Sequence, residues 1–249
     1  MTNTKFDKWA TGFSGCDGGD IGSPQNPSVW FCGIEWGGGH PADEEKLRDI
    51  FSEDVRMPAE GYTDDDDDDG EPAWKHNIAY IFNWQAMKLL AAINGEHVSI
   101  YKSFAEKLKP FVKNESGYYK MNLYPFAFRN TSHQLWQEGF AKATGIQSKQ
   151  DYLDWIRAHR LPVMKTWAVT YAPRLILCTG ITYLNDFRSA FVDDGLMLNH
   201  EMIDDRELHW VVNKNETIVI VIPFMVNRNG LTRNISIQKF GERIRELLH

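Results

Sequence analysis

The chain has few cysteines and lacks a long apolar run. Its three cysteines (Cys16, Cys32 and Cys178) are odd in number and far apart in 249 residues. This argues against a disulfide framework and a clustered metal site, and favours a reducing compartment. No signal peptide is predicted, because the polar N-terminus is not followed by a sustained apolar segment. No apolar run reaches the roughly 20 residues that cross a bilayer, so we expect a soluble, cytoplasmic protein with no membrane partner.

The chain also lacks the strong basic charge that would point directly to nucleic acid. Its formal net charge is −7, but six adjacent aspartates (64–69) account for most of the excess. Basic residues dominate near the C-terminus, where residues 225–245 carry Arg228, Arg233, Lys239, Arg243 and Arg245 against the single acid Glu242. The overall charge therefore does not exclude a nucleic-acid partner.

The aspartate run lies in residues 54–73, which we expect to form an exposed excursion because adjacent carboxylates repel one another. Calcium-binding loops intersperse their ligands with glycine at fixed spacing and finish on a glutamate, and the run lacks that pattern. A charge block that mimics or repels DNA phosphates is an alternative that the sequence leaves open. No metal ion and no cofactor is predicted.

Short apolar runs bounded by turn residues predict buried strands, and apolar residues at helical spacing predict helices between them. The strands are expected at 29–34, 118–126, 174–180 and 217–223, the last in a hairpin with 209–213. The helices are expected at 41–51, 76–93, 97–112, 131–144, 149–172 with a break near Pro162, 183–192 and 236–248. Residues 1–28 are expected to be irregular, with a simple turn at 15–20 favoured over a tight loop that carries two spare carboxylates, Asp17 and Asp20. This alternation predicts an α/β fold, a three-layer αβα sandwich around a central, mainly parallel four-stranded sheet, in a single domain over residues 1–249.

The first predicted strand ends in a carboxylate, an aromatic residue and three glycines, namely Glu35, Trp36, Gly37, Gly38 and Gly39. In an open parallel sheet, ligands bind just beyond the carboxyl ends of the strands, and glycine lets the backbone approach a ligand closely. Glu35 is therefore a candidate reaction centre. The alternative is a solvated glutamate in a flexible turn.

The strand ends, taken together, resemble those of the uracil-DNA glycosylase superfamily. Residues 33–37 (GIEWG) are similar to the family's first motif, and residues 121–125 (MNLYP) to its second strand, which ends in asparagine. A third strand ends in glycine, as at Gly180, and residues 222–224 (IPF) stand where the family has His-Pro-Ser or a relative. The resemblance extends over roughly residues 29–248 and implies the same three-layer fold.

The resemblance implies a DNA glycosylase, which cuts the bond between a flipped-out base and its deoxyribose. This cleavage passes through a sugar cation like that of glycoside hydrolysis, and it requires a group that orients water and donors for the departing base. Glu35 matches the water-activating carboxylate, and Asn122 matches the asparagine that reads the pyrimidine edge. Phe82 falls where some members stack an aromatic ring on the flipped base, and His40 is a candidate for contacting a phosphate or base oxygen. An ordinary turn, strand-end, core or loop role is the alternative for each.

Trp36 and Gly37 bear on the substrate. Uracil-selective members have tyrosine at the position of Gly37, which excludes bases with a 5-substituent, whereas glycine leaves space. Together with Trp36 and the acidic excursion, this predicts a bulkier pyrimidine as substrate. Hydroxymethylated or glucosylated cytosine of phage DNA is one such base, and its excision would be an antiviral defence activity.

Residues 225–234 follow the last strand and look like the family's DNA-inserting loop. Arg228 and Arg233 are candidates for holding phosphates beside the flipped nucleotide, with Asn229 between them, and Leu231 is a candidate for filling the vacated stack. A solvated loop is the alternative. We expect DNA as the partner and a monomer, and no iron–sulfur cluster, because three cysteines fall short of the four that ligate one in some members.

Two departures from the family pattern keep other interpretations open. Trp36 stands where the family usually has proline, and Ile222 stands where it often has histidine. The missing histidine favours a regulatory protein of the same fold that binds DNA or a nucleotide without cleaving it. A different α/β hydrolase acting on small nucleotides would need a nucleophile elbow or a phosphate loop, and the sequence has neither.

Overall fold

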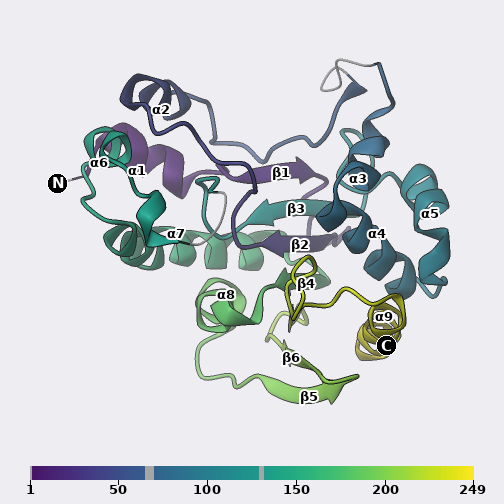
Figure 1. Ribbon diagram of the computed structural model, residues 1–249. Helices are drawn as coiled ribbons and strands as arrows, with labels where there is room; N and C mark the ends of the chain where they lie inside the picture. Colours follow the sequence, from purple (N-terminus) through teal and green to yellow (C-terminus); the bar gives the residue numbers. More distant parts are fainter. Residues whose placement is uncertain (1, 65–69, 129–131) are drawn as a thin grey trace.

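A computed structural model describes residues 2–64, 70–128 and 132–249. In these ranges the chain forms a seven-stranded mixed sheet in the order β1-β3-β2-β4-β7-β6-β5 (Figure 1). The strands are β1 Cys16–Gly19, β2 Val29–Gly33, β3 Tyr118–Asn122, β4 Leu175–Thr179, β5 Asn199–Ile203, β6 Arg206–Val212 and β7 Ile218–Ile222. The helices are α1 Thr4–Thr11, α2 Glu44–Ile50, α3 His76–Ala79, α4 Ile81–Ile93, α5 Tyr101–Leu108, α6 Glu138–Thr144, α7 Lys149–Tyr171, α8 Leu184–Phe191 and α9 Asn234–Leu247.

The four central strands, β3-β2-β4-β7, are parallel throughout, and they are the four strands that the sequence predicts. The α/β class and the mainly parallel core are thus confirmed, but the predicted count of four strands is wrong. β1 adds to one edge antiparallel to β3, and the β5–β6 hairpin adds to the other edge antiparallel to β7. β1 and β5 escape the sequence patterns because β1 is Cys-Asp-Gly-Gly and β5 is exposed and polar. β6 is predicted in part, as the strand at 209–213 that forms a hairpin with the last parallel strand.

Helices cover both faces of the sheet, and all residues of the four central strands are buried. Alternate side chains of β2 separate the two cores: Trp30 packs on the side of α1, α7 and α8, and Phe31 packs on the side of α4, α5 and α9. Figure 1 shows these two groups of helices on opposite sides of the sheet. No helix in the described ranges has the length and apolar character needed to cross a membrane.

Two predicted helices differ from the structure because of local backbone chemistry. Tyr80 is extended and divides the helix expected at 76–93 into α3 and α4, and the Asn83 side chain donates to the His76 carbonyl at the break. By contrast, α7 runs through Pro162, and the predicted break is wrong. Pro162 is exposed, so the carbonyl that loses its helical partner faces water at modest cost.

Several other predicted helices are shorter at their ends. α5 ends at Leu108 rather than 112, because Lys109 turns into the left-handed region and a proline follows. α2 begins at Glu44, after the capping residue Asp43. α6 begins only at Glu138, after a short 3₁₀ turn, and residue 131 of the helix expected at 131–144 lies outside the described ranges.

The sequence predicts an irregular segment at residues 1–28, but the structure has α1 and β1 there. Arg160 of α7 holds it in place: the buried guanidinium donates hydrogen bonds to the carbonyls of Ala10, Gly12 and Ser14 and, on the neighbouring strand end, of Leu123. A buried charge is stable only when its donors are satisfied in this way. The arrangement fixes β1 beside the carboxyl end of β3.

The predicted excursion at 54–73 is exposed only in part. Glu60 forms a β-bridge with Gly18 of β1, and Tyr62 forms one with Val112. Gly18 has a positive φ of 101°, and a side chain there would collide with the Ala59 backbone. Five of the six aspartates in the run, residues 65–69, lie outside the described residues. The described part thus returns to the sheet and brings the Tyr62 side chain to the candidate site.

Candidate functional site

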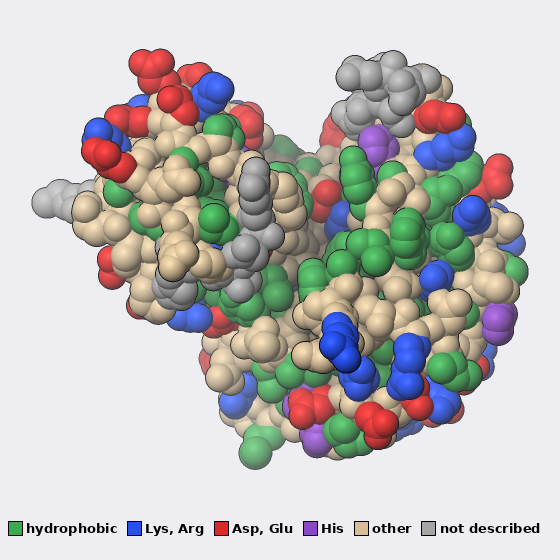
Figure 2. All heavy atoms as spheres, viewed as in Figure 1, with side chains coloured by type: hydrophobic (Ala, Val, Ile, Leu, Met, Phe, Trp, Pro, Cys, Tyr) green, Lys and Arg blue, Asp and Glu red, His purple; other side chains and the backbone are tan. Residues whose placement is uncertain are grey.

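A cavity of about 710 Å³ opens at the carboxyl ends of β2 and β3 and beside the segment that follows β7. In Figure 2 it lies in the hollow between the lobe with α2 and α6 and the lobe with α3 and α4. The strand order reverses at β2, which is where ligands bind in open α/β sheets. Its lining includes four of the residues predicted from the sequence: Glu35, Trp36, Gly37 and Asn122, and α4 adds a fifth, Phe82.

Glu35 follows β2, and its carboxylate is nearly excluded from water, with 8% of the side chain exposed. Oε2 lies 3.6 Å from the ammonium Nζ of Lys149, whose side chain is 1% exposed. Oε1 is buried and accepts no hydrogen bond from the described residues. Burial raises the pKa of Glu35 to about 7, against the opposing effect of Lys149. Glu35 is therefore a proton acceptor poised near neutral pH, and its Oε1 has no hydrogen-bond partner among the described residues.

Lys149 comes to Glu35 through the start of α7. Ser148 caps this helix by accepting a hydrogen bond from the Asp151 amide, so Lys149 is its first residue. The Lys149 ammonium also lies 3.9 Å from the centroid of the Phe128 ring. Burial lowers the pKa of Lys149, and Glu35 opposes that shift. The pair thus combines a carboxylate and an ammonium that are both poorly solvated.

Asn122 ends β3 directly beside Gly33, the last residue of β2. Its amide nitrogen donates to the Gly15 carbonyl at 3.1 Å, and its oxygen occupies the space where a side chain at position 33 would begin. Position 33 therefore requires glycine, because any side chain there would collide with the Asn122 amide oxygen. The amide is held in one orientation and borders the cavity, so its remaining donor and acceptor capacity can meet the edge of a planar ligand.

Aromatic side chains form the apolar wall of the cavity. Phe82 stacks on Phe224, with ring centroids 5.6 Å apart and planes 28° apart, and contacts Phe31 of β2 edge to face. Trp36 lies across the cavity lining and donates from Nε1 to the Asp17 carboxylate at 3.1 Å. This hydrogen bond explains the tryptophan that follows Glu35. A flat ring can stack against such a wall.

Asp17, Lys120 and Tyr62 form a polar cluster in the same cavity. The Lys120 ammonium donates to the Tyr62 hydroxyl at 2.9 Å and to the Asn83 amide oxygen at 3.1 Å, and it lies 3.4 Å from the Asp17 carboxylate. Burial alone would lower the pKa of Lys120, but Asp17 and Tyr62 raise it above its ordinary value. Lys120 is therefore a fixed cation. The sequence interpretation missed this cluster and assigned Asp17 to a simple turn.

His76 adds an unsatisfied polar atom to this end of the cavity. Its ring lies 5.0 Å from that of Tyr62, and its buried Nε2 has no hydrogen-bond partner among the described residues. Buried polar atoms of this kind generally have a partner in the functional state. The cavity lining therefore includes two side chains with a buried polar atom that has no partner among the described residues, Glu35 and His76.

His40 does not border the cavity, in contrast to its predicted catalytic role. Its backbone N–H donates to the Ala127 carbonyl at 2.8 Å, and its Nδ1 accepts from the Ala127 amide at 2.7 Å. Burial lowers the pKa of His40, so the ring is neutral at physiological pH and Nδ1 is occupied. The ring also stacks on Trp36, with a centroid separation of 6.4 Å. His40 therefore supports the wall behind the site rather than reaching into it.

The loop after β7 carries the exposed cations Arg228 and Arg233, and the buried side chain of Leu231. Arg228 and Asn229 are exposed and can meet a polyanion. Arg233 pairs with Asp204 at 2.9 Å, so its charge is partly neutralised. Leu231 is fully buried in the core beneath α4 and α9, and its backbone amide bonds to the Phe224 carbonyl. The predicted insertion of Leu231 into a base stack is wrong, because a core side chain cannot leave without opening a cavity.

The position of the expected family histidine is apolar. Ile222 is fully buried in the core at the end of β7 and offers no donor to the cavity. Gly180, directly after β4, has a positive φ of 126° and packs against the Ile34 side chain. A side chain at position 180 would collide with Ile34 and so displace the residue before Glu35.

No model of a known protein family matches the chain, and no curated protein matches it. What the cavity can bind and do must therefore be inferred from its own residues.

Proposed function

We propose that the protein is a DNA glycosylase that hydrolyses the N-glycosidic bond of a flipped-out pyrimidine and leaves an abasic site. The single observation that carries this proposal is the Glu35 carboxylate, buried at the carboxyl end of β2 with a pKa of about 7 and with one oxygen that has no partner in the described part of the chain. An enzyme that must activate water at neutral pH needs a base of this kind. The aromatic wall and the fixed amide of Asn122 supply the rest of a base-binding pocket.

In this mechanism the base leaves first as an anion, and a sugar cation develops at the carbon that held it. The ionised Glu35 stabilises that positive charge and accepts a proton from the attacking water, whose oxygen forms the new bond to the sugar. The departing base takes the electron pair of the broken bond and accepts hydrogen bonds from the site. The Asn122 amide nitrogen donates one N–H to Gly15 and can donate the other to the base, and the nearby Lys120 ammonium adds positive charge to the cavity lining.

The aromatic residues suit a flipped base. Phe82 already stacks on Phe224 with nearly parallel planes, so a planar ring placed on the other face of Phe82 continues an existing stack. Base flipping costs a few kcal/mol of stacking and pairing energy, and stacking in the pocket offsets that cost. Arg228 and Asn229, both exposed on the loop after β7, are placed to contact phosphates.

The substrate that fits best is a pyrimidine with a bulky polar substituent, such as glucosylated hydroxymethylcytosine of phage DNA, whose removal would act in antiviral defence. The cavity lies within the size range of pockets that enclose drug-sized ligands, which is more than a bare pyrimidine requires. Gly37 leaves its mouth open, because a Cβ there would meet nothing within 4 Å. Asp17, Lys120 and Tyr62 offer donors and acceptors to hydroxyl groups.

The test is a cleavage assay on a panel of duplex and single-stranded oligonucleotides that carry uracil, 5-hydroxymethylcytosine or its glucosylated form. Alkali converts each abasic site to a strand break. We expect breaks with the wild type and a loss of 10²-fold or more with Glu35→Gln. The matched control is Glu45→Gln, which changes an exposed glutamate of α2 and should leave cleavage unchanged.

One observation favours a second function, that of a DNA- or nucleotide-binding protein without cleavage. Ile222 replaces the polar residue of the family pattern with a buried aliphatic side chain, so one donor for the departing base is missing. This function predicts binding of a modified oligonucleotide with no breaks on any base, and equal binding by Glu35→Gln. Breaks that depend on Glu35 would exclude it.

A further inference from the structure

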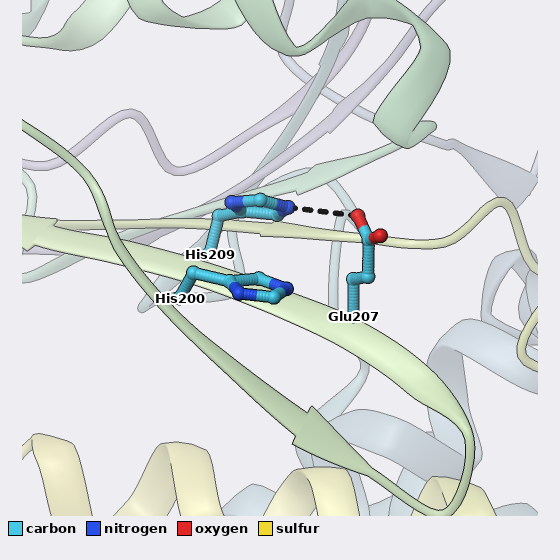
Figure 3. Close-up of side chains that lie close together, drawn as sticks. All are labelled: His200, Glu207 and His209. Atoms are coloured by element: carbon cyan, nitrogen blue, oxygen red, sulfur yellow. Dashed lines mark hydrogen bonds and ion pairs between the residues drawn. The ribbon is translucent and has the colours of Figure 1, made fainter.

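Three side chains of types that can bind a metal ion lie together on the edge hairpin, and none of them lines the cavity. His200 of β5 is directly opposite His209 of β6, and Glu207 lies two residues before His209 on the same strand. Side chains alternate along a strand, so all three project from one face of the hairpin. Figure 3 shows the two imidazole rings stacked, each with a nitrogen on the side of the Glu207 carboxylate. The strand register therefore builds the group.

The distances suit a shared ligand. One ligand atom from each residue lies within 4.8 Å of the others, and the His209 Nε2 and Glu207 Oε2 atoms are 3.1 Å apart. Zinc bonds of 2.0–2.2 Å in a tetrahedral site place ligand atoms about 3.4 Å apart. To bind one ion, the ligand atoms must therefore move together by about an ångström, which side-chain rotation can supply.

The surroundings leave the group available. Within the described ranges, Glu207 pairs with His209 and with no lysine or arginine. The two imidazole rings are 4.7 Å apart between centroids, a spacing at which two imidazolium ions would repel each other. Neutral imidazole is the commonest protein ligand for transition metals. The two imidazoles and the carboxylate are therefore close enough together to bind one ion.

We propose that His200, Glu207 and His209 form a binding site for a divalent transition-metal ion, with Zn²⁺ as the best fit. Two imidazoles and one carboxylate are a frequent protein ligand set for zinc, and they leave a fourth position for water or another ligand. Mg²⁺ and Ca²⁺ prefer all-oxygen ligands and should not compete. The site goes beyond the proposed glycosylase function and does not depend on it.

The site connects to the loop after β7 through the same hairpin. Arg206, next to Glu207, donates to the Gly230 carbonyl at 3.2 Å, and Asp204 in the hairpin turn pairs with Arg233. Glu207 also lines a groove of about 350 Å³ together with Asn227 and Asn229 of that loop. A metal ion that joins β5 to β6 would therefore stabilise the hairpin that holds this loop.

The test uses the full chain without a histidine tag, freed of metal by dialysis against chelator and titrated with Zn²⁺ in a calorimeter. We expect one equivalent to bind in the micromolar range or tighter, and the unfolding temperature to rise by about 5 °C at a hundredfold excess over the dissociation constant. Co²⁺ should give the visible absorption of tetrahedral coordination. Mg²⁺ should cause neither change.

Variants decide whether this hairpin is the site. His200→Ala and Glu207→Gln should each weaken Zn²⁺ binding at least tenfold, and His159→Ala, at an exposed histidine of α7, should not. His200 is exposed, and circular dichroism will verify that its variant is folded; Glu207→Gln keeps the shape of the side chain. Equal binding by both hairpin variants and the wild type, or no stoichiometric binding by the wild type, would overturn the proposal.

Discussion

The Glu35 carboxylate and the Lys149 ammonium lie 3.6 Å apart, with 8% and 1% of their side chains exposed. One residue follows the first parallel strand and the other begins α7, so the fold brings them together across 114 positions of sequence. Burial opposes both charges, raising the pKa of Glu35 to about 7 and lowering that of Lys149. This pair determines how the proposed reaction should depend on pH.

Glycosylase activity should rise with pH through about 7. The ionised form of Glu35 is the base. Because its pKa is about 7, the ionised fraction rises about tenfold for each unit of increasing pH well below 7, and it levels off above 7. We expect kcat/KM measured between pH 5.5 and 8.5 to follow a single ionisation with a midpoint near 7. A flat profile, or activity that falls over this range, would contradict the role of Glu35 as base.

The same pKa predicts a stability difference between the wild type and Glu35→Gln. In the native state Glu35 keeps its proton up to about pH 7, whereas in the unfolded chain it loses the proton near pH 4.5. Between these values the native state binds more protons, so Glu35 makes the wild type less stable as pH rises. The stability of Glu35→Gln relative to wild type should therefore increase from pH 4.5 to 8, by up to about 3 kcal/mol. Urea unfolding at a series of pH values measures it.

Lys149→Met should shift the activity profile to higher pH. Methionine keeps the length and apolar character of the buried stem but removes the ammonium that favours ionised Glu35. We expect the midpoint to rise by about one pH unit, with activity at pH 7 down about fivefold and activity at pH 9 largely kept. The matched control is Lys165→Met on the same helix, which removes an ion pair with the exposed Asp194 and should leave the midpoint in place.

The sequence predicts the parallel core and the carboxylate at its edge, because buried strands and glycine turns have strong local patterns. Glu35 follows β2 and Asn122 ends the adjacent β3, both beside the same cavity, which Phe82 also borders. Asp17 and Lys149 could not be assigned in this way. Asp17 lies in a glycine-rich strand that only the pairing with β3 defines, and Lys149 reaches Glu35 only through the packing of a distant helix.

The misassigned residues have the same origin. Leu231 and His40 occur in loops that resemble functional segments, but one side chain completes the core and the other is fixed to Ala127. A sequence pattern gives position along the chain and does not give the direction of a loop side chain. The hairpin histidines escaped notice for a related reason, since β5 has no apolar alternation to reveal its register.

Gly37→Tyr should restrict the substrate. A Cβ at position 37 meets nothing within 4 Å and the residue does not have a positive φ, so the variant should fold normally with its ring over the cavity mouth. We expect kcat/KM for a base with a bulky 5-substituent to fall at least tenfold relative to that for an unsubstituted base. Gly37→Ala is the control and should keep the wild-type ratio. An unchanged ratio in Gly37→Tyr would mean that substrates do not enter past this residue.

Gly33→Ala should disable the site through Asn122. The new methyl group would occupy the place of the Asn122 amide oxygen, which must then move and give up its hydrogen bond to Gly15. We expect a loss of about 1–2 kcal/mol of stability in urea unfolding and a fall in activity close to that of Asn122→Ala. Gly37→Ala, in open space, again serves as the control.

The double variant separates this displacement from a general disturbance of β2. Once Asn122 is alanine, the methyl group at position 33 has room, so Gly33→Ala should add little further loss in either activity or stability. The coupling between the two substitutions should therefore be at least 1 kcal/mol, as expected for residues that compete for one space. Additive losses would show that Gly33 acts on the strand itself, and that the orientation of the Asn122 amide does not depend on it.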